Sequence, residues 1–405
     1  MKTPRLMLFD VTSGGHHGMF VQHLVEAWVA RGETEQLVLV VPPDFLDVHR
    51  DLQRVIGEIA PERVSVVPID RPLPDPGSGV GDLVRFDFGQ GDIARDYIDR
   101  LKPDHCLCMH FDHVQLWLAF GARPIHPASI SGIYFRPTFH YEKWPGHAPS
   151  WKQKLNNARK RFTLKRALRH PLFNTLFSLD PFVVPDLQRW GTPASIVALP
   201  DGITPHTALE DHPPPHILQE IEPDRKVALL FGALSSRKGI FSTLEALRRL
   251  PAPLQSRLAV VFAGAVEPSE RGAFLAAALG VRQETRLQVL IDDRFLPDAD
   301  IQSLLHASDL VLVTYQQHVG SSNVVIRAAA AGKPVIGPTY GLLGQQIRTH
   351  HLGATVDTQS PDALMRALER YLETGAVPFD AAKAAAFAQE NTAEAFASTI
   401  LDRLV

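Results

Sequence analysis

Short apolar runs alternate with amphipathic segments along the chain, and this alternation limits the possible folds more than any other feature. The run Leu37–Val41 is almost continuously apolar, as expected for a strand buried on both faces of a parallel sheet. Ahead of it, Phe20, Leu24 and Trp28 fall on one face of a helix. Strands that alternate with helices in this way indicate βαβ units and parallel sheets.

The pattern predicts two series of strands, separated at residues 200–225 by a segment rich in proline. The predicted strands are Leu6–Asp10, Leu37–Val41, Val64–Ile69, Cys106–His110, Ile130–Phe135 and Ser195–Leu199, then Val227–Phe231, Leu258–Ala263, Leu287–Ile291, Leu310–Thr314 and Pro334–Ile336. Three consecutive prolines at 213–215 cannot continue a helix or a central strand. A chain of 405 residues also exceeds what one hydrophobic core usually serves.

We therefore predict an α/β protein with two doubly wound, Rossmann-like domains that face a cleft. Residues 1–205 form the first domain and residues 206–385 the second. Residues 386–405 form a terminal helix that packs back towards the first domain.

The bulk composition indicates a cytoplasmic protein. The net charge of −3 gives no global field that would favour nucleic acid as a partner. The apolar run at residues 6–9 is too short for a secretory signal, and no stretch approaches the roughly 20 apolar residues that span a bilayer. Cys106 and Cys108 alternate on one strand, which favours buried thiols on one face over a metal or redox role.

Two strand-to-helix joints contain glycines, one near the start of each half. Glycine lets the backbone turn tightly and lets an anion approach the N–H groups of a helix N-terminus. The first joint contains Gly14 and Gly15, followed by His16 and His17. Gly14 and Gly15 are interpreted either as part of the site that binds the phosphates of a ligand or as a tight turn with ordinary loop histidines.

The second joint places Arg237 and Lys238 before Gly239, where a lysine can meet a phosphate as a compact charge. A third segment predicts a short helix that starts at Ser321, Ser322 or Asn323 and ends before Gly332. The free N–H groups at the start of this helix suit a diphosphate. Both segments are predicted to bind the phosphate groups of one ligand.

These segments resemble a known family. Gly232-Ala-Leu with Lys238-Gly239, the strand after Ser308-Asp309, and Ala330-Ala-Gly-Lys-Pro-Val335 look like the donor domain of family-four retaining glycosyltransferases. Leu199-Pro-Asp-Gly-Ile203 resembles the interdomain turn of that family, and Pro103-Asp104 with His110-Phe-Asp112 resembles its acceptor-domain segment. The resemblance implies a GT-B fold, a nucleotide-sugar donor and retention of configuration.

The sequence departs from the family at three positions. Ala233 stands where the family usually has an arginine, and Val319 and Arg327 stand where it usually has two glutamates. Arginine cannot accept hydrogen bonds from a ribose. Our hypothesis is that Arg327 instead binds phosphate and partly replaces the missing charge at position 233.

The resemblance also implies roles for loops after other strands. Arg294, Phe295 and Leu296 are predicted to contact the nucleobase, with Phe295 as a ring for stacking, although the same residues could simply pack on their own domain. The candidate catalytic residues are His110, Asp112 and His16. The candidate acceptor contacts are His17, Arg136 and His140. No metal and no cofactor are expected.

The segment Trp151–His170 carries eight basic residues and no acidic one, with Trp151, Leu155, Ala158 and Phe162 on one helical face. This profile is typical of a peripheral contact with anionic lipid at the inner face of a membrane. Two alternatives stay open, an acidic acceptor and a solvated basic face whose apolar side packs on its own domain.

The predicted function is transfer of a sugar from a nucleotide sugar to a sugar, lipid-linked or small-molecule acceptor, with retention. One alternative is a non-catalytic protein that binds a nucleotide sugar or scaffolds a partner, because both motif glutamates are absent. Another is a nucleotide-sugar 2-epimerase.

Overall fold

A computed structural model describes residues 5–14, 17–32, 35–59, 63–72, 80–144, 149–204 and 213–405. The chain divides into two compact units. The first unit contains Met1–Glu142, Pro149–Gly202 and Ala393–Val405, and the second contains Lys143–Ala148 and Ile203–Thr392. None of the described helices is both long enough and apolar enough to cross a membrane.

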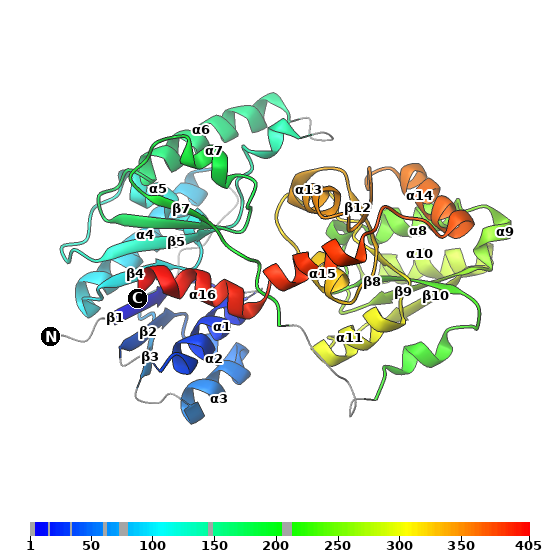
Figure 1. Cartoon of the computed structure of the whole chain (residues 1–405), viewed down its shortest axis with the longest axis horizontal. Coiled ribbons are helices and arrows are strands. Elements are labelled where there is room, and N and C mark those ends of the chain that lie inside the picture. The colour runs from blue at the N-terminus through cyan, green and yellow to red at the C-terminus, as the bar shows by residue number, and fades with distance from the viewer. Residues whose placement is uncertain are drawn as a thin grey trace. The chain divides into compact units, whose positions relative to one another are not determined.

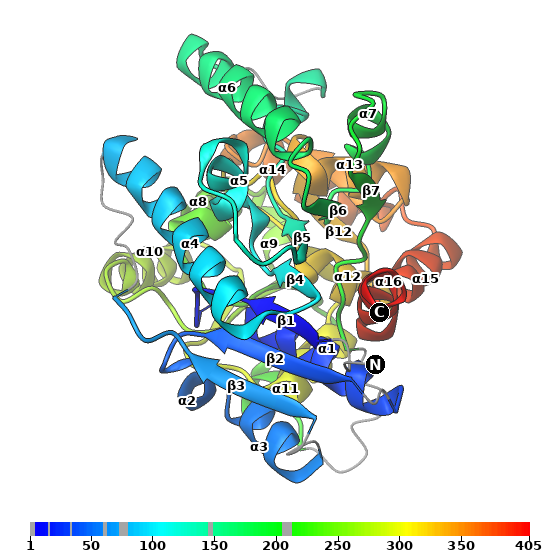
Figure 2. The same ribbon diagram turned by 90° about the vertical axis from the view of Figure 1, so that its left-hand side faces the viewer.

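The first unit is built on a parallel sheet of seven strands in the order β3-β2-β1-β4-β5-β6-β7 (Figures 1 and 2). The strands are β1 (Arg5–Phe9), β2 (Gln36–Val41), β3 (Val64–Pro68), β4 (His105–Cys108), β5 (Ser129–Tyr134), β6 (Phe173–Ser178) and β7 (Ser195–Ala198). The strand order reverses between β1 and β4, which is the doubly wound pattern. Strand β6 was not among the predicted strands.

Both faces of this sheet are buried, as the continuous apolar runs predict. Met7, Cys106 and Cys108 belong to one core cluster, whereas Leu8 and Leu107 belong to the cluster on the opposite face. The two cysteines therefore lie on one face as buried free thiols, as predicted. A hydrogen bond with Cys108, together with burial, raises the pKa of the Cys106 thiol.

Helices cover both faces of the first sheet. They are α1 (His17–Ala30), α2 (Phe45–Val48), α3 (Arg50–Ile59), α4 (Val80–Leu101), α5 (Phe111–Phe120), α6 (Trp151–Ala167), α7 (Val184–Gln188) and α16 (Ala393–Leu404), with one 3-10 turn, η1 (Tyr141–Lys143). The last helix packs on the first, where the rings of Phe396 and Phe20 stack with their centroids 4.7 Å apart.

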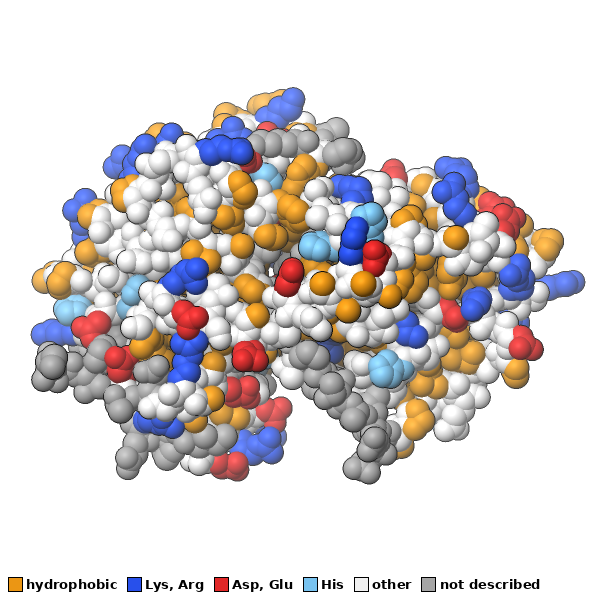
Figure 3. Space-filling model, viewed as in Figure 1, with side chains coloured by type: hydrophobic (Ala, Val, Ile, Leu, Met, Phe, Trp, Pro, Cys, Tyr) orange, Lys and Arg blue, Asp and Glu red, His pale blue; other side chains and the backbone are white. Residues whose placement is uncertain are grey.

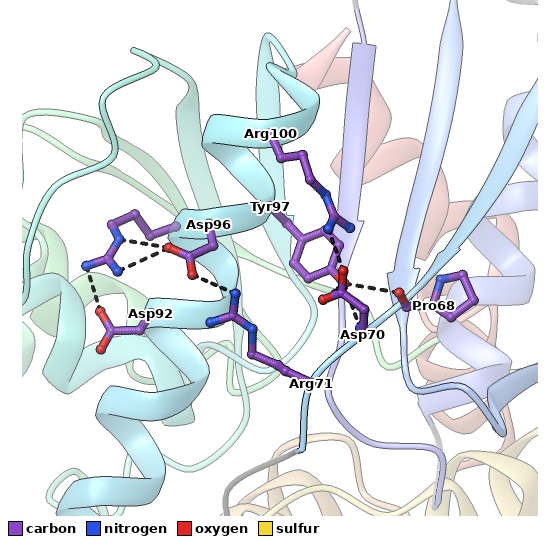
Figure 4. Close-up of polar contacts among 8 residues, drawn as sticks. Pro68, Asp70, Arg71, Asp92, Asp96, Tyr97 and Arg100 are labelled. Carbon is purple, nitrogen blue, oxygen red and sulfur yellow. Dashed lines mark hydrogen bonds and ion pairs between the residues drawn. The ribbon is translucent and has the colours of Figure 1, made fainter.

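Polar contacts join the segment after β3 to α4 (Figure 4). The Tyr97 hydroxyl donates to the Pro68 carbonyl at 3.0 Å and accepts the Asp70 N–H at 2.8 Å. Arg100 donates to the Asp70 carboxylate at 2.6 Å. Arg71 and Asp96 form a further ion pair at 2.8 Å. These contacts fix the chain where it leaves the sheet edge.

The second unit contains a parallel sheet of six strands in the order β10-β9-β8-β11-β12-β13. The strands are β8 (Lys226–Phe231), β9 (Leu258–Ala263), β10 (Gln288–Asp292), β11 (Leu310–Leu312), β12 (Val335–Pro338) and β13 (Gly353–Val356). The order reverses between β8 and β11. Strand β13 was not among the predicted strands.

Helices also cover both faces of the second sheet. They are α8 (Ile240–Arg248), α9 (Ala252–Gln255), α10 (Arg271–Glu284), α11 (Asp298–Ala307), α12 (Asn323–Ala330), α13 (Gly341–Thr349), α14 (Pro361–Thr374) and α15 (Ala381–Glu390), with the 3-10 turns η2 (His216–Glu220) and η3 (Ser236–Lys238). Separate core clusters fill the two faces. The predicted class, α/β with two doubly wound sheets, is confirmed.

Candidate active site

In each unit the strand order reverses at one point, and ligands of open parallel sheets collect at the carboxyl ends of strands beside such a point. In the second unit these strands are β8 and β11. The loop after β8 contains Lys238, and the loop after β11 leads from Thr314 to Ser322. The residues predicted to bind phosphate therefore lie at the position where the fold favours a ligand.

Lys238 is a nearly buried cation at this position, with 7% of its surface exposed. Its Nζ donates to the Phe231 carbonyl and lies 5.1 Å from the centroid of the Tyr315 ring. It forms no ion pair with any residue that the structure describes. A buried ammonium without a carboxylate is costly, so this environment favours an incoming anion.

Glycines make room for Lys238. Gly232 has a φ of +97°, and a Cβ at this position would lie 2.6 Å from the lysine Nζ. Gly239 has a φ of +79°, and its Cβ would lie 2.0 Å from the Thr314 carbonyl. The backbone conformation therefore favours glycine at both positions. At Gly239 the Thr314 carbonyl also leaves no space for a Cβ, and at Gly232 a Cβ would displace the lysine Nζ. The Thr314 hydroxyl donates to the Lys238 carbonyl at 2.9 Å, which joins the two loops.

Tyr315 organises the loop after β11, and the sequence did not identify it. Its hydroxyl is 2.9 Å from the Ser322 Oγ, and the Arg237 guanidinium lies 5.5 Å from its ring centroid. Burial raises the pKa of Tyr315, but the Lys238 charge and the hydrogen bond with Ser322 outweigh it, so the pKa is lowered overall. Its place directly after a predicted strand was the only available signal.

The helix predicted from the Ser-Ser-Asn sequence is α12. Its N-cap is Ser322, whose side chain accepts the Val324 N–H. Arg327 lies in the last turn with 14% of its side chain exposed, and its Nη2 forms an ion pair with Asp298 at 2.9 Å. The guanidinium has five N–H donors, so this pairing leaves others for a ligand.

The three residues predicted to contact a nucleobase have different surroundings. Phe295 is 85% exposed, so its ring is available for stacking, whereas Leu296 is buried in the core. Arg294 is held by two carboxylates, Asp292 at 2.9 Å and Asp300 at 2.6 Å. These contacts orient the loop and leave the phenyl ring facing solvent.

In the first unit, the strand order reverses between β1 and β4, and His110 and Asp112 follow β4. The Asp112 carboxylate accepts N–H groups from Phe135 at 2.9 Å and Arg136 at 3.2 Å. His110 Nε2 lies 3.9 Å from it. Burial raises the pKa of Asp112, and the Phe135 N–H and the nearby His113 oppose this shift.

Other predicted acceptor residues are placed differently. His140 is buried and its Nδ1 lies 3.1 Å from the Asp186 carboxylate, while Arg136 is exposed. Gly14 is exposed near the start of α1. Gly15, His16 and the His17 side chain lie outside the described residues.

Lys160 is a further charged residue near this site, although the sequence placed it only within a basic face. Its Nζ donates to the Thr138 hydroxyl at 3.2 Å. Burial lowers the pKa of Lys160, and the nearby Asp112 carboxylate opposes this shift. The site therefore contains a carboxylate, an imidazole and an amine that can exchange protons or bind hydroxyl groups.

The two parallel sheets, each with candidate binding loops at the point where its strand order reverses, match the GT-B fold. Residues 218–393, which lie almost entirely within the second unit, match the family model described as "Glycosyl transferases group 1". This result confirms the predicted glycosyltransferase class. No curated protein matches the sequence.

Several solved structures share the fold over nearly the whole chain. HepE of Anabaena, solved in complex with UDP and glucose, is 15% identical with a TM-score of 0.63, and 98% of each chain is covered. Sucrose-phosphate synthase from Thermosynechococcus elongatus is 18% identical with a TM-score of 0.66, over 99% of this chain and 98% of that one. WaaG, a glycosyltransferase involved in lipopolysaccharide biosynthesis, is 16% identical with a TM-score of 0.59, over 98% and 95%.

Proposed function

We propose that this protein transfers a sugar from a nucleoside-diphosphate sugar to a sugar, lipid-linked or small-molecule acceptor, with retention of the anomeric configuration. The observation that carries the proposal is the Lys238 ammonium, which is buried beside two aromatic rings and has no carboxylate partner among the described residues. A diphosphate would supply the missing negative charge.

The second unit would bind the donor. Lys238, Arg237 and the N-terminal N–H groups of α12, around Ser321, Ser322 and Asn323, would contact the phosphates. Arg327 would add a further cation, and Phe295 would stack on the base. HepE was solved with UDP, so a uridine-diphosphate sugar is the first donor to test. We propose that these cations act without a bound metal.

The first unit would bind the acceptor through His110, Asp112 and Arg136, beside the loop that contains Gly14 and Gly15. In the transfer, the bond between the sugar C1 and the diphosphate oxygen breaks, and the acceptor oxygen bonds to C1 on the same face. The acceptor proton would pass to the departing phosphate, and His110 would assist this transfer. Cations and helix N–H groups that stabilise the departing charge are the main catalytic requirement of this route.

The experiment that tests the proposal starts with thermal shift against nucleoside diphosphates and their sugars. A ligand at 100 times its Kd stabilises a protein by about 2.7 kcal/mol. Any donor that binds is then incubated with the enzyme, and the released or transferred sugar is followed by NMR of its anomeric proton. An initial product with the donor's configuration is expected.

The other outcomes separate the alternatives. An inverted initial anomer would overturn retention. A donor sugar changed at C2 would indicate a 2-epimerase. Binding with neither hydrolysis nor transfer to any acceptor would indicate a non-catalytic protein that binds a nucleotide sugar. We also propose that the enzyme works in the cytoplasm, at the inner face of a membrane where a lipid-linked acceptor would be presented.

A further inference from the structure

Helix α6 presents large apolar side chains to solvent. Nine large hydrophobic residues are exposed within the described part of the chain, and four of them lie on α6 or at the end of α5. These four are Phe120, Trp151, Leu155 and Phe162. Trp151 and Leu155 are 71% and 66% exposed. The alternative in which this apolar side packs on its own domain is therefore wrong.

The side of α6 that packs on the unit is partly polar. Asn157, Thr163, Leu164 and Ala167 are its buried residues. Gln115 on α5 donates to the Thr163 hydroxyl at 2.5 Å. A capping box between Ser150 and Gln153 fixes the N-terminus of the helix. The helix is thus held firmly with its outer apolar residues away from the core.

The same helix is strongly basic. No Asp or Glu occurs between Lys143 and Leu179. The cations on and just after α6 are Lys152, Lys154, Arg159, Lys160, Arg161, Lys165, Arg166 and Arg169. None of them forms an ion pair with a described residue, whereas Arg249 in the second unit pairs with both Glu245 and Asp362. Figure 3 shows blue and orange side chains gathered together over α6.

A groove of about 480 Å³ lies where the second half of α6 meets the end of α5. Its cations are Arg123, Lys165, Arg166 and Arg169, and its apolar lining includes Leu118 and Phe162. Arg166 is fixed in place, since its Nε donates to the Ala119 carbonyl at 2.5 Å and its guanidinium lies 4.8 Å from the Phe120 ring centroid. Cations around an apolar floor match a phosphate group attached to a hydrocarbon chain.

We propose that α6 and the end of α5 form a docking surface for a bilayer of anionic phospholipid, with the groove holding a phosphate headgroup. Trp151, Leu155 and Phe162 enter the interface between headgroups and acyl chains, where amphipathic aromatic rings are favoured. Unpaired cations beside them attract the anionic surface. A soluble acidic partner would account for the charges but not for the exposed apolar side chains.

The test uses the full chain without any donor, so its result does not depend on the proposed reaction. The protein is mixed with vesicles of phosphatidylcholine alone, or with roughly 30 mol % phosphatidylglycerol added, and bound protein is measured by flotation. Binding is expected only with the anionic vesicles, and it should weaken as salt screens the charges. Binding to both vesicle types alike, or to neither, would overturn the proposal.

A triple variant tests the groove, with Arg123→Gln, Lys165→Gln and Arg169→Gln. Each cation near an anionic surface contributes about 1 kcal/mol, so partition should fall roughly a hundredfold. The matched control removes three exposed cations of the second unit, by Arg366→Gln, Arg370→Gln and Lys383→Gln, and should bind like the wild type. Equal partition of the two triple variants would overturn the proposal, as would tighter binding to RNA than to anionic vesicles.

A second variant tests the apolar contribution independently. Leu155→Ser with Phe162→Ser keeps every cation and changes only exposed side chains. Vesicle binding should fall at least tenfold, because about 1.4 kcal/mol of apolar transfer corresponds to tenfold. Unchanged binding would show that charge alone drives the contact and would overturn the insertion of this face.

Discussion

The Lys238 ammonium lies 5.1 Å from the centroid of the Tyr315 ring, in a nearly buried position. The Tyr315 hydroxyl in turn lies 2.9 Å from Ser322, the N-cap of α12. One aromatic ring thus connects a buried cation with the N-terminus of a helix. Both are groups that bind phosphate, and both lie beside the point where the strand order of the second sheet reverses.

Replacing Lys238 by methionine keeps most of the apolar stem and removes the charge. A hydrogen bond to a charged group contributes roughly 1.5–3 kcal/mol, so nucleoside-diphosphate affinity should fall at least tenfold. The unliganded protein should melt at the same temperature or higher, because an uncompensated buried charge is lost. Isothermal titration and thermal melts measure the two effects. Lys383→Met is the control, and equal affinities of the two variants would contradict a phosphate role for Lys238.

Gly232→Ala tests whether the space around Lys238 is needed. The added Cβ would lie 2.6 Å from the lysine Nζ, at a backbone φ of +97° that alanine rarely adopts. Donor affinity should fall and the melting temperature should drop. Gly272→Ala in α10 is the matched control, since its Cβ would meet nothing within 4 Å, and alanine favours a helix. A binding constant for Gly232→Ala equal to that of the control would contradict the prediction.

The Arg327–Asp298 pair tests the hypothesis about the arginine that replaces a motif glutamate. If Arg327 contacts phosphate, Arg327→Ala should weaken donor binding by about tenfold or more. Asp298→Ala, which removes only its partner, should weaken binding less or strengthen it. Titration of both variants with one nucleotide sugar gives the comparison. Unchanged affinity in Arg327→Ala would refute the hypothesis.

A buried carboxyl in the first unit predicts a pH dependence of stability. Burial raises the pKa of Asp180 to about 7 in the folded protein, while an unfolded aspartate releases its proton near about 3.9. The native state therefore binds more protons between these values, and stability from this group falls as pH rises through that window, then levels off.

Asp180→Asn removes this titration and keeps an oxygen that can accept the Phe182 N–H. The stability of the variant relative to the wild type should increase from about pH 4 to about pH 7 and stay constant above. Urea unfolding across this range measures the difference. A difference that does not change with pH would show that Asp180 ionises normally.

The sequence predicted the architecture better than the site, for physical reasons that individual residues illustrate. Continuous apolar runs such as Leu258–Ala263 identify buried strands without further information, whereas β6 begins Phe-Asn-Thr and was missed because polar residues interrupt its apolar pattern. The glycines around Lys238 predicted a phosphate loop. Tyr315 could not be assigned a role, since its importance depends on contacts with residues distant in sequence.

The orientation of α6 also required the structure. Periodicity placed Trp151, Leu155 and Phe162 on one face, but it could not distinguish a face that packs on the protein from one that faces solvent. The buried residues Asn157 and Thr163 decide this, because their side chains are polar and gave no apolar signal. Polar anchoring of a helix is therefore difficult to recognise in a sequence.

Because α16 belongs to the first unit, that unit becomes complete only when the last residues of the chain have been synthesised. Phe396, Ile400 and Leu401 are fully buried there beside Phe20 and Trp28. A ribosome that has released only the first 202 residues has therefore not yet supplied part of that unit's core. The second unit, whose residues lie between these two parts of the sequence, is completely synthesised before α16 is available to the first unit.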